Sequence, residues 1–269
     1  MTRGRTTQVL THHWDGSALV RRPDHLIVEE PLEVHLDGHL VGTTMRTPGH
    51  DFELAAGLVH ADGLLAGAPV LSCRYCATGA AVETGFNVVS VETGGVAPEP
   101  SPRVAASTSA CGMCGSTAID ELRERIAPIP VGAPWSVELL AGVPAVVQPD
   151  QDLFAATGAV HAAAAFDRAG TPLLVREDIG RHNAVDKVVG RLLLDDRLPA
   201  TDLGLYVSGR AGFEIVQKAW AAGFSAVVSV SAPSALAVEA ARRAGITLVG
   251  FVRGDAPVAN LYSPEVLPG

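Results

Sequence analysis

The stretch LGLYVSGRAGFEIVQKAWAAGFSAVVSV, residues 203–230, determines the fold class of this 269-residue chain. An apolar run at residues 203–207 leads into a glycine-rich turn, a helical pattern over residues 213–222 and a second apolar run at residues 226–230. Apolar runs that alternate with helices are typical of strands in a sheet that helices cover on both faces. We therefore predict an α/β layer architecture.

The same alternation continues on both sides of this stretch. Further strands are predicted at residues 173–176 and 247–252, and further helices at residues 153–164, 183–194 and 234–244. These elements should form one α/β domain over residues 116–269.

The first half of the chain has a different pattern. LIVEEPLEVHLDGHLVGTT, residues 26–44, alternates apolar and polar residues around Asp37-Gly38 and predicts a β-hairpin. A helix should follow near Phe52–Val59 and short strands near residues 70–72 and 87–91, which predicts a smaller β-rich N-terminal lobe over residues 25–115. We expect residues 1–24 to form a flexible tail.

Composition excludes several classes of protein. The formal net charge of -9 argues against nucleic-acid binding, because no basic excess can serve phosphates along a duplex. No apolar run approaches the roughly 18 residues of a membrane span, and the N-terminus has no apolar segment typical of a secretory signal. We expect a cytoplasmic protein without a membrane partner, whose four cysteines are reduced at rest.

The cysteines form two pairs, CRYC at residues 73–76 and CGMC at residues 111–114. A four-thiolate zinc site is one interpretation, although the 34 residues between the pairs exceed the spacing of a compact zinc ribbon. Cys73 ends a strand-like run, where side chains three apart point to opposite faces of the sheet. Cys73 and Cys76 could equally be small buried hydrophobes.

The second pair lies where a segment rich in Gly, Pro and Ser, residues 93–110, meets the helical pattern STAIDELRERI. A helix N-terminus lowers the pKa of a neighbouring thiol and makes it a better nucleophile. A disulfide oxidoreductase would use the same chemistry, but its motif should directly follow a strand. A mobile loop suits a carrier that must visit two places, so metal, redox and carrier functions stay open at this point.

Three glycine- or arginine-bearing turns follow predicted strands. The first turn groups five polar residues, and the others are Ser208-Gly209-Arg210 and Arg253-Gly254. The five are Glu177, Asp178, Arg181, His182 and Asn183. Ligands bind at the carboxyl ends of strands in open α/β sheets, and Gly with Arg at a helix start suits phosphate. The three turns should therefore converge on one polyphosphate pocket, although the first could also be only a helix cap with an exposed arginine.

His161 belongs to the segment TGAVHAAAAF. Zinc deaminases carry a catalytic Glu two residues after such a histidine, but Ala163 occupies that position here. The sequence therefore argues against deaminase chemistry, and His161 is either a hydrogen-bonding group of the cleft or a core histidine.

Seven segments together resemble the FdhD family, the formate dehydrogenase accessory sulfurtransferases. They are HDFELAAGLVHADGLL, SACGMCG, TGAVHAAAAF, REDIGRHNAVDKVVG, SGRAGFEIVQKA, SAPSALAVEAARRAGITLVGFVRG and the closing NLY. Their order and their span over nearly everything after residue 24 make the resemblance specific.

The resemblance implies a fold and an activity. It implies a three-layer α/β domain similar to that of cytidine deaminases, without zinc, and a homodimer. It also implies that sulfur arrives as a persulfide from a cysteine desulfurase and passes to the molybdenum (or tungsten) bis-molybdopterin guanine dinucleotide cofactor, which makes formate dehydrogenase active. A non-catalytic chaperone for that cofactor is the alternative, and a zinc-binding structural protein is a third.

Position by position, the resemblance implies that Cys111 carries the persulfide, and we expect Cys114 to have a resolving or activating role. The cofactor segment of the family falls on Phe251, Val252, Arg253, Gly254, Asp255 and Ala256. This chain departs from the family immediately afterwards, because RGDAPVAN is longer and less basic than the usual loop. Arg181, His182 and Arg210 complete the predicted cofactor-binding residues.

Overall fold

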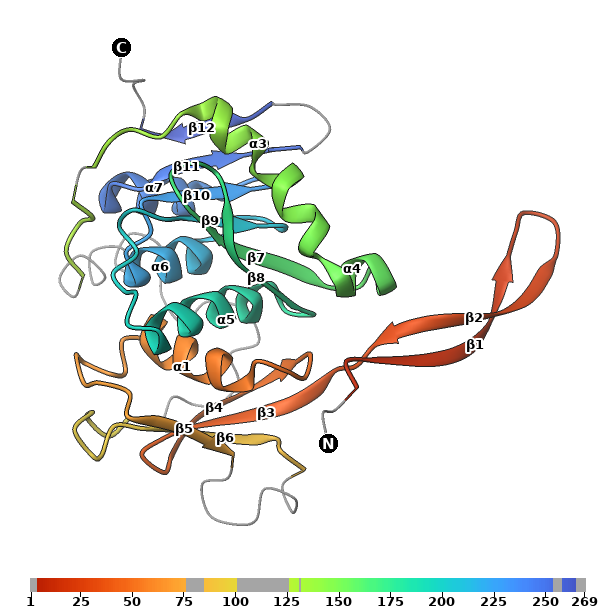
Figure 1. Cartoon of the computed structure of the whole chain (residues 1–269), viewed down its shortest axis with the longest axis horizontal. Coiled ribbons are helices and arrows are strands. Elements are labelled where there is room, and N and C mark those ends of the chain that lie inside the picture. The colour runs from red at the N-terminus through yellow and green to blue at the C-terminus, as the bar shows by residue number, and fades with distance from the viewer. Residues whose placement is uncertain (1–3, 76–84, 101–125, 131, 254–257, 265–269) are drawn as a thin grey trace.

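The computed structural model describes residues 4–75, 85–100, 126–130, 132–253 and 258–264. Two separate sheets and an N-terminal two-stranded ribbon make up its β structure (Figure 1). No helix within the described ranges is long and apolar enough to cross a membrane.

The larger sheet has six strands in the order β12-β11-β10-β9-β7-β8. Their bounds are β7 (His161–Phe166), β8 (Pro172–Asp178), β9 (Gly204–Val207), β10 (Ala226–Ser229), β11 (Thr247–Gly250) and β12 (Asn260–Ser263). β9, β10 and β11 are parallel, and β7 is antiparallel to both of its neighbours, β8 and β9. The carboxyl ends of β8 to β11 therefore meet the amino end of β7 at one edge of the sheet.

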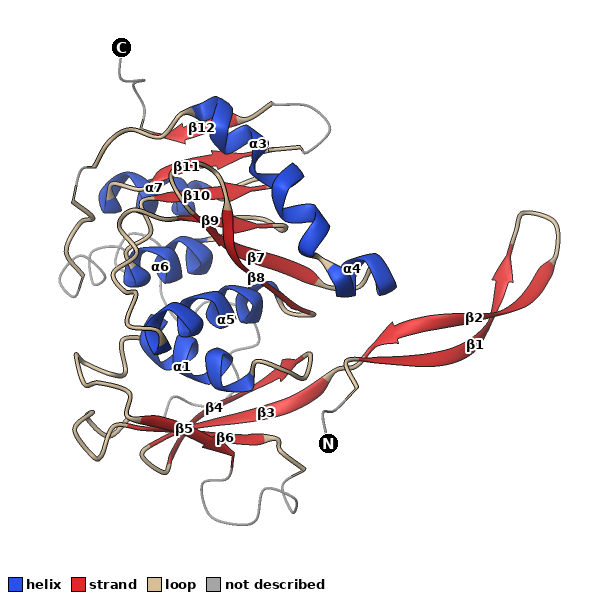
Figure 2. Ribbon diagram, in the orientation of Figure 1, coloured by secondary structure: helices blue, strands red, loops and turns tan. Residues whose placement is uncertain are grey.

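Helices cover both faces of this sheet (Figure 2). One face is covered by α5 (Arg181–Leu194), α6 (Phe213–Ala222) and α7 (Ala235–Ala244), and the other by α3 (Val137–Val147). Alternate residues of β7 serve the two cores, because Ala163 and Ala165 pack with α5 and α6 while Ala162 and Ala164 pack with α3. The predicted three-layer α/β domain is confirmed.

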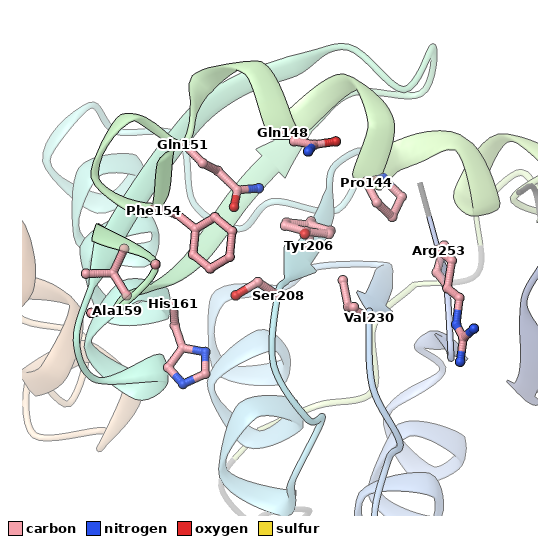
Figure 3. A pocket seen from close by; sticks show the side chains of 13 residues that line it. Pro144, Gln148, Gln151, Phe154, Ala159, His161, Tyr206, Ser208, Val230 and Arg253 are labelled. Atoms are coloured by element: carbon pink, nitrogen blue, oxygen red, sulfur yellow. The ribbon is translucent and has the colours of Figure 1, made fainter. Parts of the chain in front are cut away.

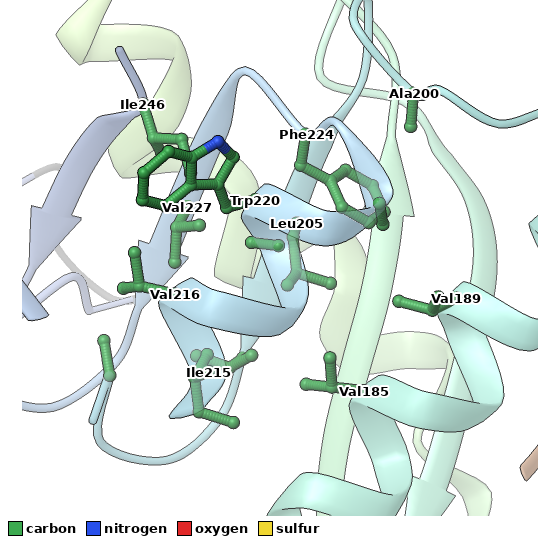
Figure 4. Packing of buried hydrophobic residues seen from close by; sticks show 14 of the residues in the cluster. Val185, Val189, Ala200, Leu205, Ile215, Val216, Trp220, Phe224, Val227 and Ile246 are labelled. Carbon is green, nitrogen blue, oxygen red and sulfur yellow. The ribbon is translucent and has the colours of Figure 1, made fainter. Parts of the chain in front are cut away.

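The larger core centres on aromatic side chains of the α6 region (Figure 4). Trp220 and Phe224 are fully buried against Val189, Leu205 and Ile246. The indole Nε1 of Trp220 donates a hydrogen bond to the carbonyl of Ala127 at 2.9 Å, so the polar edge of this large side chain is satisfied.

The smaller sheet has the order β4-β3-β6-β5 and packs against one helix. Its elements are β3 (Glu30–Leu36), β4 (His39–Arg46), β5 (Ser72–Tyr75), β6 (Val88–Glu92) and α1 (Asp51–Ala61). The hairpin predicted around Asp37-Gly38 is confirmed, and both turn residues have positive φ. α1 lies between this sheet and α5, so it joins the two parts of the structure.

The contact between α1 and α5 depends on two glycines. A Cβ on Gly57 would stand 1.9 Å from the carbonyl oxygen of Asp186, and a Cβ on Gly190 would stand 1.8 Å from that of Glu53. No side chain fits at either position, so the two backbones approach each other directly. Beside this contact, Nη2 of Arg176 on β8 donates a hydrogen bond to Oε1 of Glu53 on α1 at 2.9 Å.

Two sequence-based predictions of secondary structure are wrong. Residues 1–24 were expected to form a flexible tail, but β1 (Thr6–Trp14) and β2 (Leu19–Ile27) pair in register as an antiparallel hairpin. The predicted helix over residues 153–164 ends early, because α4 (Asp152–Thr157) stops at Gly158 in the left-handed region and β7 follows. Helix α3 was not predicted, since Pro144 interrupts its pattern.

The predicted loop over residues 93–110 is described only at its start. Thr93 is buried there, and its backbone N–H donates to Oδ1 of Asp37 at 2.7 Å. Oγ1 of Thr93 also accepts a hydrogen bond from the N–H of Ala97 at 3.0 Å, so this first part is anchored rather than free. The CGMCG pentad and the helix predicted after it lie outside the described residues.

Candidate functional site

A cavity of about 590 Å³ opens at the carboxyl edge of the larger sheet. The segment from α3 to α4 forms one wall, and the strand ends form the other (Figure 3). His161 and Arg253 lie at opposite sides of this cavity, with Phe154, Tyr206 and Ser208 between them. Its volume lies in the range of about 300–1,000 Å³ found for small-molecule sites.

The wall from α3 to α4 supplies residues that sequence reasoning missed. Gln148 belongs to η1 (Gln148–Asp150), Gln151 follows it, and the exposed Phe154 lies on α4. No sequence motif marks them, because they become neighbours of the strand ends only through the packing of α3 on the sheet. They add two amides and one aromatic face to the cavity.

Two polar residues that line the cavity, Ser208 and His161, come from the edge of the sheet. Ser208 Oγ accepts a hydrogen bond from the N–H of Ala162 at 2.9 Å, which leaves its hydroxyl proton available to a ligand. Burial, and then the electrostatic effect of the neighbouring Arg181 and His182, lower the pKa of His161. A neutral imidazole at this position can both donate and accept a hydrogen bond near pH 7.

The turn after β8 divides its five polar residues between two tasks. Glu177 accepts hydrogen bonds at 2.8 Å from the N–H groups of both Leu153 and Phe154, and so holds the start of α4. Asp178 and Asn183 are also buried and are used internally. Arg181 and His182 are half-buried, and Nε2 of His182 lies 2.9 Å from Oε2 of Glu214 on α6. Of the five polar residues of this turn, only Arg181 and His182 are partly exposed to solvent.

Asp178 is the centre of a buried polar network. One oxygen accepts from the N–H of Thr47 at 3.1 Å and lies 2.7 Å from Nζ of Lys187. The other accepts from the N–H of Gly180 at 2.8 Å and from the amide of Asn183 at 3.1 Å. The network therefore ties the turn that carries Arg181 to the β4 end of the smaller sheet.

The turn after β9 also meets the first turn. A Cβ on Gly209 would stand 3.4 Å from Nδ1 of His161 and 3.7 Å from Cδ of Arg181. Ser208 lines the cavity, whereas the exposed Arg210 is not among its lining residues. The structure thus places Ser208 in the pocket, whereas the predicted Arg181, His182 and Arg210 are not among its lining residues.

Half of the predicted cofactor segment falls within the described residues. Val252 and Arg253 line the cavity, and Phe251 is exposed beside them with a φ of 56°. Gly254, Asp255 and Ala256 lie outside the described residues. The three predicted turns do share one edge of the sheet, but their strands are not adjacent, because β7 separates β8 from β9 and β10 separates β9 from β11.

Of the four cysteines, the structure describes only Cys73. Its side chain is half-buried on β5 and packs against the core of the smaller sheet. Burial, together with the charge of Glu92, raises the pKa of its thiol to about 11. Cys73 is therefore a protonated, apolar-packed thiol rather than a nucleophile. Among the described residues no cluster of three or more His, Cys, Asp and Glu could hold a metal ion.

Comparison with known proteins agrees with this arrangement. Residues 27–266 match the FdhD/NarQ family. A sulfur carrier protein FdhD from Nocardia farcinica is 48% identical over 248 residues, which cover 91% of this chain and 88% of the relative. One from Anaeromyxobacter dehalogenans is 47% identical over 255 residues, covering 89% and 87%.

A crystal structure from Desulfotalea psychrophila, titled as a formate dehydrogenase accessory protein, has the same fold. It superposes with a TM-score of 0.74 over 97% of this chain and 99% of the other, at 22% identity. Residues 27–266, which match the FdhD/NarQ family, include the α1–α5 contact, the polar turns and the cavity described above. This chain belongs to the FdhD/NarQ family.

Proposed function

We propose that this protein is a sulfur carrier for formate dehydrogenase, and that it acts as a sulfurtransferase in the cytoplasm. Sulfur arrives from a cysteine desulfurase, is held as a persulfide on Cys111 and is passed to the bis-molybdopterin guanine dinucleotide cofactor of the client. The names of close relatives support the carrier role. The observation that carries the proposal for the cofactor is the open cavity between His161 and Arg253.

The chemistry of the cavity fits a nucleotide end of that substrate. Arg253 offers a planar, permanently charged group suited to a diphosphate. Ser208 offers a hydroxyl, and Gln148 and Gln151 offer amides that can hydrogen-bond to a base. Phe154 adds an exposed ring against which a planar base can pack. The volume suits one nucleotide moiety rather than the whole cofactor.

His161 marks the other side of the cavity, and Arg181 lies close to it without being one of the lining residues. Because the pKa of His161 is lowered, its imidazole is neutral near pH 7 and does not add charge to the site. Positive charge near His161 comes from Arg181, which belongs to the turn that Asp178 holds through Gly180 and Asn183. In the proposed function these residues orient the substrate and provide hydrogen bonds, while the sulfur is brought by the cysteine segment.

The loading step is an exchange of sulfane sulfur. The thiolate of Cys111 attacks the outer sulfur of the desulfurase persulfide, forms a new S–S bond and releases the desulfurase cysteine as a thiolate. No electrons are gained or lost overall, so no added oxidant is needed. Cys114 is proposed to activate or resolve the resulting persulfide.

Mass spectrometry of the chain after incubation with a cysteine desulfurase and cysteine tests the proposal. We expect an adduct of one sulfur atom on Cys111, absent from Cys111→Ala and still present in the matched control Cys73→Ala. Cys111→Ala should also fail to activate formate dehydrogenase. A Cys111→Ala protein that activates the enzyme fully would contradict the mechanism.

A chaperone that only holds the cofactor is the second candidate, because the cavity alone could serve it. Cyanolysis of sulfane sulfur separates the two, since only a carrier yields thiocyanate after loading. The proposed protein holds no zinc; about one zinc per chain, lost when both cysteine pairs are replaced, would instead support a structural metal site.

A further inference from the structure

The short helix α4, which forms part of the second wall of the cavity, is capped from outside. Its N-cap residue is Gln151, but the side chain of Gln151 accepts no hydrogen bond from the described first turn. A cap normally accepts from the backbone N–H groups of the second and third helical residues, which here are Leu153 and Phe154. Another group must therefore accept from these two donors.

Glu177 at the end of β8 is that group. Its Oε2 accepts a hydrogen bond from the N–H of Leu153 and its Oε1 accepts one from the N–H of Phe154, both at 2.8 Å, and Glu177 is buried. Hydrogen bonds to an ionised carboxylate are stronger than those between neutral groups, and a bidentate pair also fixes the geometry. The last residues of a strand of the large sheet thus hold the first turn of α4.

This external cap leaves the amide of Gln151 to the cavity. Gln151 lines the cavity although the residue is only 8% exposed. Figure 3 shows its amide beside the ring of Phe154 on the same wall. The wall therefore presents a hydrogen-bonding amide next to an aromatic ring, and Glu177 holds the segment that carries both.

The next residue of β8 serves a different element. Asp178 belongs to the buried network that contains Thr47 and Lys187, whereas the carboxylate of Glu177 contacts α4. Successive side chains of a strand point to opposite faces of the sheet. A change in the side chain of Glu177 should therefore move α4 without disturbing the Asp178 network.

We propose that Glu177 is a positioning residue for the base of the bound nucleotide, because it holds Phe154 and Gln151 where a planar base packs between α4 and the strand ends. This inference rests on the proposed function, in which a nucleotide end of the cofactor occupies the cavity. Arg253 lies at the opposite side of the cavity from His161, away from α4. The effect of Glu177 is therefore on the base and not on the diphosphate.

Calorimetry with guanosine diphosphate measures the effect of Glu177→Gln. The substitution keeps the shape of the side chain but replaces one acceptor oxygen with an amide group that faces a backbone N–H. We expect binding to be about tenfold weaker, close to the loss of one base stacked on an aromatic ring. The control is Glu53→Gln, which removes the carboxylate paired with Arg176 on β8 and should lower stability but leave the affinity nearly unchanged. Equal losses of affinity in both variants would overturn the proposal.

Double-mutant cycles test whether the effect passes through the wall. In an Arg253→Ala background, Glu177→Gln should again weaken binding about tenfold, because effects at independent sites add. In a Phe154→Ala background it should weaken binding clearly less, because the ring that Glu177 holds in place is gone. The same factor in both backgrounds would overturn the role of Glu177 as a positioning residue.

Hydrogen exchange of the full chain gives a readout that needs no ligand. In Glu177→Gln the amides of Leu153 and Phe154 should exchange about tenfold faster or more, while α5 keeps its wild-type rates. Adding Gln151→Asp supplies a cap from α4 itself and should restore the protection. Unchanged exchange in Glu177→Gln would overturn the proposal, and so would fast exchange that the added aspartate does not slow.

Failure of the inference and failure of the proposed function give different results. A wild-type chain that binds no guanosine diphosphate would contradict the nucleotide site, and with it the role of Glu177 toward a base. A wild-type chain that binds the nucleotide, with an affinity that Glu177→Gln leaves unchanged, would overturn the inference alone.

Discussion

Lys187 on α5 and Asp178 at the end of β8 lie 2.7 Å apart, and neither side chain is exposed to solvent. Nζ of Lys187 also donates to the carbonyl oxygens of Thr47 at 3.0 Å and Glu177 at 3.3 Å. The other lysine of the chain, Lys218, pairs with the buried Asp186 at 2.6 Å. Both lysines therefore pair with buried aspartates. The other 18 of the 20 Lys and Arg residues in the chain are arginines.

Removing the ammonium from this pair should be costly. Lys187→Met leaves the buried carboxylate of Asp178 without its cationic partner. We expect a loss of about 3–5 kcal/mol in the free energy of unfolding. Urea denaturation measures it. Glu239→Gln is the control, since Glu239 pairs with Arg243 on the surface and its loss should change stability by less than about 1 kcal/mol. A loss of similar size in both variants would contradict this role of Lys187.

Gly→Ala substitutions should have opposite effects on stability inside and outside the α1–α5 contact. Gly57→Ala and Gly190→Ala place a Cβ inside the partner backbone, so each should destabilise the protein by about 1–3 kcal/mol or more. Gly142→Ala in α3 meets nothing within 4 Å and should stabilise it by about 0.5–1 kcal/mol. Thermal and urea unfolding check the signs. A stabilising Gly57→Ala would show that the helices can separate without cost.

The ion pair of Glu53 and Arg176 should make stability depend on pH in the acid range. Burial alone would raise the pKa of Glu53, but hydrogen bonds from Arg176 and His50 lower it to about 2, below its ordinary value of 4.5. The unfolded chain therefore takes up a proton first, and stability is present above pH 4.5 and is lost as the pH falls toward 2. The full effect is about 3 kcal/mol.

The measurement is the difference in unfolding free energy between the wild type and Glu53→Gln at several pH values. We expect the difference to be largest near pH 6 and to shrink between pH 4.5 and 2.5, because over this range the carboxyl of Glu53 takes up a proton in the unfolded chain while it stays ionised in the folded protein. A difference that stays constant over this range would show that the charge of Glu53 contributes nothing.

The position of the arginines predicts unequal effects on nucleotide binding. Arg253 lines the cavity and Arg210 does not. A charged hydrogen bond to phosphate contributes about 1.5–3 kcal/mol, so Arg253→Ala should weaken guanosine diphosphate binding about tenfold or more. Arg210→Ala, an exposed arginine of the neighbouring turn, is the matched control and should bind nearly as well as the wild type. Calorimetry measures both; equal affinities would exclude Arg253 from the site.

Much of the fold could be predicted because its signals are local. The apolar runs at Gly204–Val207 and Ala226–Ser229, with the helix Phe213–Ala222 between them, form the elements that their periodicity predicts. The turn at Asp37-Gly38 was predicted because few residue pairs adopt positive φ at both positions. Local patterns also indicated that polar turns end the strands of one sheet edge.

Other features were decided only by tertiary packing. His161–Phe166 has the composition of a helix, but its alanines must fill the narrow space between two layers of helices, and an extended strand presents alternate residues to both layers. Gly204 has no room for a Cβ, which would stand 2.1 Å from Cζ of Phe166. Intrinsic helix propensity is too small to oppose burial on both faces.

The candidate site shows the same division. The sequence by itself determined which turns carry arginine, histidine and serine, because strand ends and helix starts follow from local pattern. Only the tertiary structure decided that Glu177, Asp178 and Lys187 are internal supports, that Arg210 lies outside the cavity, and that Gln148, Gln151 and Phe154 form its second wall. The physical reason is that burial and neighbours depend on contacts between residues far apart in the chain, which no local pattern encodes.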